Sequence, residues 1–206
     1  MEKMDTAAKT ATKTTNATNA SSTKKGSEKK EQNLECLLKE GLKAMYSAET
    51  QLVEALPEMA KAADSEELQD AIEKHLQETK RHAERLEKIF SKLGIDKSEV
   101  KKCMVMESLI NEGKKVIEDF EAGPVRDSAI IIGAQKVEHH EIAAYGSLCE
   151  LCDVLGYHKI GDILDRTLEE EENTDSDLTD IAQDINDEAY ESSEHEEEYE
   201  YEDQEL

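Results

Sequence analysis

Several carboxylates fall within stripes of residues that should face the interior of a helical protein. Glu138 and Glu141 are three residues apart, so they share one face of a helix, and that face otherwise carries apolar residues. Glu49 and Glu171 occupy similar positions in two other periodic segments. Buried carboxylates cannot stay ionised close together without a counter-charge, because burial and mutual repulsion both disfavour the charged form. The pattern therefore predicts a carboxylate cluster that binds cations.

A further segment places imidazoles and a carboxylate along a similar stripe, which contains His75, Glu78 beside Thr79, and His82. Carboxylates combined with one or two imidazoles suit iron or manganese, so we predict a dinuclear site for one of these metals. The predicted metal ligands are Glu49, His75, Glu78, Glu138, Glu141 and Glu171. The spacing leaves open whether His82 or Glu107 is also a ligand, because an inward His can instead hydrogen-bond a carboxylate.

Each predicted ligand has an alternative role. The glutamates could form ion pairs on the surface, and Glu169, Glu170 or Glu172 could point inward in place of Glu171. Tyr46 and Tyr145 are either core aromatics or phenols that serve a metal pair. The sequence does not choose among these roles.

Five helical segments are predicted to position these residues. Apolar residues recur at steps of three and four, and Gly and Pro fall mainly between the periodic blocks. The predicted helices cover residues 34–63, 65–93, 103–120, 124–155 and 159–185. We expect Asn33 to cap the first helix, Asp64 to cap the second, and Leu37 to face inward. Four long helices and one short one joined by short loops indicate an all-α antiparallel bundle.

The predicted ligands lie at similar depths in their helices. The five carboxylates fall about 13–16 residues from the helix starts, near the midpoints of helices about 27–31 residues long. Antiparallel helices of similar length superimpose their midpoints, whichever way each one runs. All five carboxylates are therefore expected to meet at one level of the bundle.

The two ends of the chain differ from its middle. Residues 1–33 repeat Thr, Ala, Lys, Asn and Ser without an apolar period, which predicts a disordered arm. From Glu169 to Leu206 there are 19 acidic residues and no Lys or Arg, and we predict a disordered acidic tail over residues 186–206. The bundle is thus expected to occupy residues 34–185. The formal net charge of −25 disfavours a nucleic-acid partner.

No apolar run approaches the roughly 20 residues that span a bilayer, and the N-terminus has no apolar segment of the signal-peptide kind. We therefore expect a cytoplasmic protein without a membrane partner. The four cysteines are expected to be small buried side chains in a reducing compartment. A zinc or redox pair formed by Cys149 and Cys152 is the alternative.

These residues also carry a resemblance that extends over about residues 34–182. The segments concerned are Tyr46-Ser-Ala-Glu49, Leu56-Pro57, His75-Leu-Gln-Glu78-Thr79, Cys103-x-x-Met106-Glu107, Val125-Arg-Asp127, Gln135-Lys-Val-Glu-His139-x-Glu141 with Tyr145-Gly146, and Thr167-Leu-Glu-Glu-Glu. In order and content they resemble the bacterial YciE/YciF-type stress proteins of the ferritin-like superfamily. The resemblance implies a ferritin-like four-helix bundle with one additional short helix, dimerisation, a cytoplasmic location, and a rubrerythrin-like dimetal centre.

Two functions follow as alternatives. The first is a dimetal oxidoreductase, of peroxidase or ferroxidase type, that handles peroxide, oxygen or Fe(II) during stress with a redox partner that the sequence does not identify. The second is a non-enzymatic bundle that binds a partner through a helix face or a tail. Two departures from the wider superfamily bear on the ligand set: His75 precedes Glu78 where a Glu-x-x-His order is usual, and Thr174 stands where a His could follow Glu171.

Overall fold

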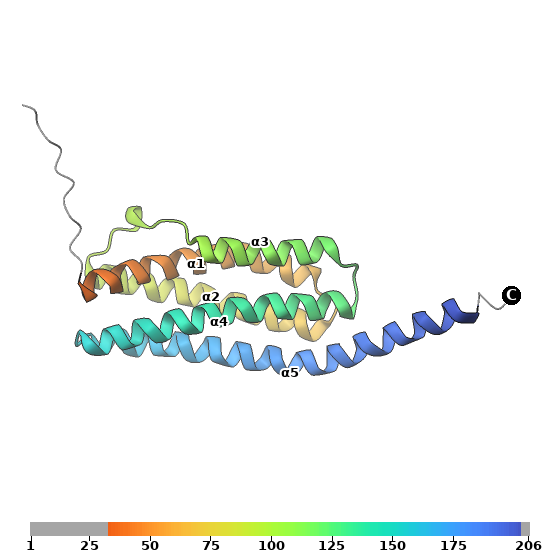
Figure 1. Cartoon of the computed structure of the whole chain (residues 1–206). Helices are drawn as coiled ribbons and strands as arrows, with labels where there is room; N and C mark the ends of the chain where they lie inside the picture. The colour runs from red at the N-terminus through yellow and green to blue at the C-terminus, as the bar shows by residue number, and fades with distance from the viewer. Residues whose placement is uncertain (1–32, 203–206) are drawn as a thin grey trace, which may run out of the picture. The chain divides into compact units, whose positions relative to one another are not determined.

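The computed structural model describes residues 33–202, with side chains through Ser192. Within this range there are five α-helices and no strand (Figure 1): α1 (Leu34–Ala62), α2 (Glu66–Leu93), α3 (Met104–Asp119), α4 (Pro124–Val154) and α5 (His158–Glu202). The predicted all-α class and the five helices are confirmed. No helix in the described part of the chain is long and apolar enough to cross a membrane. The predicted arm at residues 1–33 lies outside this range except for Asn33.

The four long helices pack as two hairpins. Helix α1 packs on α2 and α4 packs on α5, while further contacts join α1 to α4 and α2 to α5. Helix α3 lies against α1 and α4, and it carries the chain back along the bundle between the two hairpins (Figure 1). Helix α4 therefore begins at the same end of the bundle as α2, and these two helices run in the same direction, opposite to α1 and α5.

Local sequence signals account for most helix ends. Asn33 caps α1 as predicted, because its Oδ1 accepts a hydrogen bond from the backbone N–H of Cys36 at 2.8 Å. Gly94 ends α2 with a φ of 64°, a left-handed conformation that favours glycine. The predicted cap of α2 at Asp64 is wrong. Ser65 is the capping residue, and its hydroxyl accepts from the backbone N–H of Leu68 at 3.4 Å.

A buried carboxylate from α4 ties the first hairpin to the second. The oxygens of Asp127 accept hydrogen bonds from the backbone N–H groups of Asp64, at 2.9 and 3.1 Å, and of Ser65, at 2.7 Å. These donors lie at the start of α2, where backbone N–H groups have no partner within the helix. Asp127 thus satisfies them and fixes the end of α4 against the α1–α2 turn.

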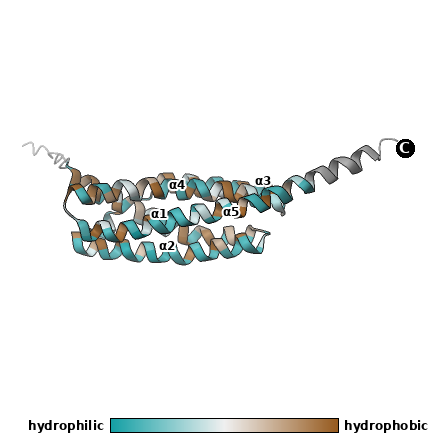
Figure 2. Cartoon of the chain, turned by 90° about the horizontal axis from the view of Figure 1, so that it is seen from below, coloured by the Kyte–Doolittle hydropathy of each residue, from teal (hydrophilic) through white to brown (hydrophobic). Residues whose placement is uncertain are grey.

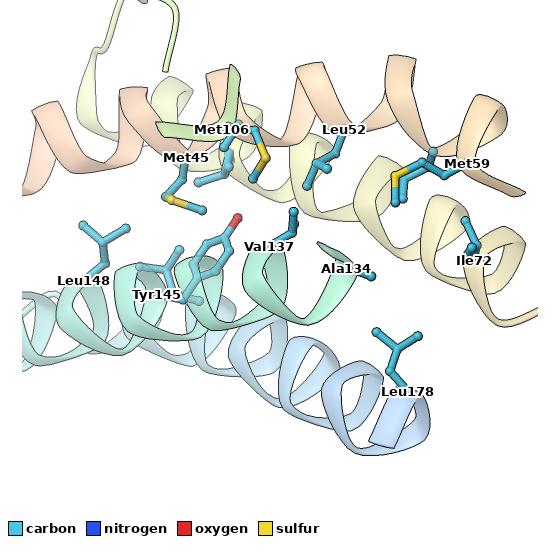
Figure 3. Close-up of a cluster of buried hydrophobic side chains, with 14 of the residues drawn as sticks. Met45, Leu52, Met59, Ile72, Met106, Ala134, Val137, Tyr145, Leu148 and Leu178 are labelled. Atoms are coloured by element: carbon cyan, nitrogen blue, oxygen red, sulfur yellow. The ribbon is translucent and has the colours of Figure 1, made fainter. Parts of the chain in front are cut away.

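Apolar side chains from all five helices form the core. Hydrophilic residues cover the outward face of α2, while apolar residues lie between the helices (Figure 2). Leu52, Met59, Val137 and Leu148 are among the side chains that converge between α1 and α4 (Figure 3). The predicted inward position of Leu37 is wrong, because its side chain is 57% exposed and the next residue, Leu38, is buried instead.

Helix α5 is longer than predicted. It continues to Glu202, although the last buried residue among the side chains described, which run through Ser192, is Ile185, where the sequence pattern predicted the end of the helix. No Gly or Pro follows Gly161, and the many glutamates beyond Ile185 have a good intrinsic helix propensity. The apolar pattern thus marks the end of burial rather than the end of the helix. Residues 203–206 of the predicted tail lie outside the described residues.

Candidate metal centre

Six titratable side chains from four helices converge inside the bundle. Helix α1 contributes one, α2 two, α4 two and α5 one, and none of the six is more than 3% exposed. They are Glu49, His75, His82, Glu138, Glu141 and Glu171. His75 and His82 are seven residues apart, which is two turns, so both imidazoles point from the same face of α2. The expected meeting of carboxylates at one level of the bundle is thus realised for four of the five.

These side chains form two groups that share one residue. His75, Glu138, Glu141 and Glu171 make up the first group, and Glu49, His82 and Glu171 make up the second. In each group, one potential ligand atom per residue lies within 4.8 Å of the others. Glu171 is therefore the residue common to both, and its neighbours Glu169 and Glu172 are exposed. A carboxylate shared by two groups has the position required to bridge two ions.

Most polar atoms of the centre have no hydrogen-bond partner of suitable geometry, and this includes His82 Nδ1 and Glu171 Oε1, although these two atoms form an ion pair 2.9 Å apart. Eight side-chain atoms of these six residues are buried without a hydrogen-bond partner: Glu49 Oε2, His75 Nε2, His82 Nδ1, Glu138 Oε2, both oxygens of Glu141 and both oxygens of Glu171. Buried polar groups in native proteins almost always have a partner, and each one without a partner costs about 1–3 kcal/mol or more if charged. A cluster of this size therefore calls for a ligand that contacts all of these atoms.

Burial and charge repulsion raise the pKa values of the acids in the centre. Burial, followed by the charges of Glu171 and Glu49, raises the pKa of Glu138 well above its usual value. Burial and the same two neighbours also raise the pKa of Glu141. Burial raises the pKa of Glu171 to about 7, although the adjacent His82 opposes this shift. Without a metal, the site therefore favours protonated carboxyls at mildly acidic pH.

The two imidazoles differ in charge. Burial and the nearby His82 lower the pKa of His75 to about 3, so His75 is neutral and offers a lone pair. Burial also disfavours the charged form of His82, but Glu171 and Glu49 outweigh this effect and raise its pKa to about 11. The Nδ1 atom of His82 lies 2.9 Å from Glu171 and 3.6 Å from Glu49. In the absence of a metal, His82 is thus the internal counter-ion of the acids.

The outer side of His82 is held by a surface ion pair. Its Nε2 lies 2.7 Å from Glu170 Oε2, and Arg85 donates two hydrogen bonds to the same carboxylate, at 2.7 and 2.8 Å. Although burial opposes it, hydrogen bonding to Arg85 and His82 lowers the pKa of Glu170 to about 2, so this carboxylate accepts the Nε2 proton. The arrangement directs the Nδ1 atom of His82 into the centre. Metal-binding histidines are commonly oriented in this way.

Tyr145 closes the centre on its α1 side. Its side chain is fully buried, and its hydroxyl donates a hydrogen bond to Glu49 Oε1. The ring projects from α4 toward α1, below Met106 of α3 (Figure 3). Burial, followed by the negative charges of Glu49 and Glu141, raises the pKa of Tyr145 and keeps the phenol protonated. Tyr145 therefore orients one oxygen of Glu49 and leaves Oε2 for another ligand. By contrast, Tyr46 bonds Glu87, away from the centre.

Two candidates from the sequence do not join the centre. Glu78 belongs to neither group; its side chain is 13% exposed and lies 3.4 Å from Arg81 in an ion pair. Glu107 is 37% exposed and pairs with Lys102. The stripe on α2 explains the difference, because His75, Thr79 and His82 follow four- and three-residue steps that leave Glu78 at its edge. His82, which the sequence left open, is buried in the second group.

The donor set fits a pair of cations. Four carboxylates carry four negative charges when ionised, which two divalent ions balance, and the two imidazoles supply neutral nitrogen ligands. Oxygen-rich sites with imidazole suit iron or manganese better than metals that prefer thiolate. No cysteine belongs to either group, and the four cysteines are free thiols. Burial raises the pKa of both Cys149 and Cys152 to about 11, which disfavours a reactive thiolate.

Comparison with known proteins relates the whole bundle to one family. The family described as "Domain of unknown function (DUF892)" matches residues 33–191. Protein YciF of Escherichia coli K12 is 47% identical over 137 residues, which make up 66% of this chain and 82% of YciF.

Solved structures agree with this relationship. The crystal structure of the E. coli stress protein YciF superimposes with a TM-score of 0.71 at 42% identity, covering 76% of this chain and 99% of that one. YcfI from Rhodopseudomonas palustris superimposes with a TM-score of 0.70 at 36% identity, covering 74% and 96% respectively. The chain therefore belongs to the DUF892 family, and its kinship with YciF confirms the predicted resemblance to the YciE/YciF-type stress proteins.

Proposed function

We propose that this chain is a ferritin-like stress-response protein that binds a carboxylate-bridged pair of iron or manganese ions. The main support is the pair of buried ligand groups that share Glu171 and leave eight polar atoms without hydrogen-bond partners. The helix order also supports the assignment, since two hairpins joined by one long crossover are typical of ferritin-like bundles. Two ions bridged by Glu171 would pair all of these atoms and neutralise the acids.

Each residue of the centre has a role in this proposal. His75, Glu138 and Glu141 would hold one ion together with Glu171, and Glu49 and His82 would hold the other with the same Glu171. Glu170 and Arg85 keep the proton of His82 on Nε2, so that Nδ1 serves as the ligand. Tyr145 holds Glu49 in place and keeps its own proton. Iron or manganese, when bound by these residues, would supply redox chemistry toward oxygen or peroxide. The surrounding apolar core excludes bulk water.

Metal analysis tests the proposal. The full chain, purified without chelators and after anaerobic addition of Fe(II) or Mn(II), should contain two ions. Glu171→Gln should lose both ions because both groups use this carboxylate, whereas Glu172→Gln removes the same charge from an exposed neighbour and should retain them. Oxygen and peroxide consumption by the loaded protein then identify the reaction.

Absence of metal from the wild type after reconstitution would reject the metal centre and favour the structural alternative, a bundle that binds a partner through a helix face or tail. Dimerisation remains a prediction from the family resemblance, which the mass of the purified protein in solution checks.

A further inference from the structure

A small cavity lies next to the candidate metal centre. Its volume is about 20 Å³, and α1, α2, α4 and α5 all contribute to its wall. The apolar part of the wall includes Leu52, Met59, Ile72, Ala134, Val137 and Leu178. These side chains surround a common space near the ends of α1 and α2 (Figure 3). This volume counts only the space that the centre of a water-sized sphere can reach. About 10–15 Å³ measured in this way holds one water molecule, so the cavity has room for one small molecule.

The cavity adjoins the metal centre. His75 and Glu138, which are both in the first ligand group, also line the cavity. His75 Nε2 lies 3.4 Å from Glu138 Oε1, and both His75 Nε2 and Glu138 Oε2 lack hydrogen-bond partners. A molecule in the cavity would therefore lie beside two side chains of the first ligand group.

The rest of the wall selects against polar molecules. It is almost wholly apolar, and the hydroxyl of Thr174 donates to the backbone carbonyl of Glu170 at 3.1 Å. Buried water needs two to four polar partners, and apolar cavities stay dry. Hydrogen peroxide is also disfavoured in an apolar cavity, because its two O–H donors would lose their hydrogen bonds to water without gaining new partners. Dioxygen has no donors and fits an apolar space of diatomic size.

We propose that this cavity is the position at which dioxygen binds beside the metal centre. This inference rests on the proposed function. Of the substrates that the proposed function leaves open, which are oxygen, peroxide and Fe(II), it selects dioxygen as the oxidant. The cavity walls supply the selectivity, and His75 and Glu138 place the bound molecule at the first ligand group.

Solution NMR of the metal-free full chain under oxygen or nitrogen pressure tests the binding position. Dioxygen is paramagnetic and accelerates the relaxation of methyl protons that it contacts. The methyls of Ile72 and Leu178 should relax several-fold faster under oxygen than those of Leu38 and Leu86, which are equally buried outside the cavity. Equal enhancement of all buried methyls would overturn the proposal. Dispersed methyl resonances verify that the chain is folded.

Matched variants test whether the cavity itself is responsible. Ala71→Val adds two carbons to the wall and should abolish the selective enhancement, whereas Ala144→Val makes the same change in a partly buried position outside the cavity and should preserve it. Val137→Ile provides a second filling variant if Ala71→Val does not fold. Selective enhancement that persists in both filling variants would contradict the proposal.

Iron analysis of the same proteins separates this inference from the proposed function. Uniform relaxation in a chain that binds two irons would reject only the dioxygen position. Selective relaxation in a chain that binds no metal would reject the metal centre, and with it the role of dioxygen as oxidant. In the iron-loaded protein, Ala71→Val should raise the oxygen concentration needed for half-maximal Fe(II) oxidation and leave the rate with peroxide unchanged. An equal effect on both oxidants would count against the inference.

Discussion

Replacing Glu138 and Glu141 with Gln should have opposite effects on metal binding and on the stability of the metal-free protein. Both side chains keep their volume but lose their charge. The ligand group that includes His75 then loses two anionic ligands, so its metal affinity should fall by at least about 100-fold, the upper end of what losing even an outer partner costs. In the metal-free protein the same change removes two buried charges that repel Glu49 and Glu171.

Glu171, whose charge contributes to the raised pKa of both Glu138 and Glu141, gives the scale and the pH window for a buried carboxyl of this centre. The pKa of Glu171 rises from 4.5 to about 7, which at 1.36 kcal/mol per unit amounts to about 3 kcal/mol. Glu138 and Glu141 shift in the same direction. A raised pKa contributes stability that is complete below pH 4.5 and is lost as the pH rises through the folded-state pKa. The metal-free wild type should therefore lose stability between about pH 5 and pH 8.

At pH 8 the metal-free double variant should be more stable than the wild type by about 1–4 kcal/mol, the range found when buried ion pairs are replaced by uncharged residues of similar volume. For a domain of this size, at about 2–4 °C per kcal/mol, the gain corresponds to a Tm higher by roughly 2–16 °C. At pH 5 the difference should nearly vanish, because the wild-type carboxyls are then protonated. Thermal unfolding followed by circular dichroism at both pH values, with metal content measured on the same samples, provides the assay.

The control is Glu169→Gln/Glu172→Gln, which has the same spacing and charge change on the exposed face of α5. It should alter neither metal content nor the pH profile. The reasoning is refuted if the Glu138→Gln/Glu141→Gln protein keeps its two metals, or if the metal-free wild type is as stable at pH 8 as at pH 5.

Three further outcomes are expected. Asp127→Ala removes the acceptor of three hydrogen bonds at the start of α2 and should destabilise the protein by about 3 kcal/mol, as measured by urea unfolding, whereas the exposed Asp119→Ala should change little. Arg85→Gln frees Glu170 to move away from His82 and should weaken metal binding about 10- to 100-fold in a competition titration, with partial recovery in Arg85→Lys. Removal of residues 1–30 and 188–206 should leave the Tm nearly unchanged, because Ile185 is the last buried residue among the side chains that the structure describes; loss of cooperative unfolding would show that the removed segments support the bundle.

Sequence periodicity predicted the helices well because burial on one face imposes three- and four-residue steps. It predicted the start of α1 at Asn33 and the end of α2 at Gly94 because the residue type alone is enough at both positions: Asn33 has a side-chain acceptor for the first turn, and Gly94, which has no side chain, adopts the left-handed conformation. The cap at Ser65 was missed because Asp64 and Ser65 are both good capping residues, and the choice depends on Asp127, which lies far away in the sequence.

The candidate site was predictable to a similar extent. An acid within an apolar stripe has few reasons to be there, so Glu49, Glu138 and Glu141 could be identified from helical spacing alone. Glu171 was ambiguous within a run of four acids, and only the packing of α5 selects it. The position of Glu78 and the open question at His82 have one cause, which is that spacing alone does not fix the edge of a stripe. Glu78 lies just beyond His82 on the surface of α2, so a rotation of the helix by a fraction of a turn decides whether Glu78 faces the interior.

The position of α3 affects how often the interior of the bundle opens to solvent. This helix makes its main contacts with α1 and α4, and Met106 and Gly113 are its buried residues. Segments with few buried apolar contacts open locally at a lower free energy than the rest of a fold. Because Met106 lies above Tyr145, which holds Glu49, detachment of α3 would uncover that side of the centre (Figure 3). We therefore expect the amides of α3 to exchange with deuterium sooner than those of α1 and α4, and the residence time of a bound ion to follow the opening rate of α3 rather than the strength of its ligands.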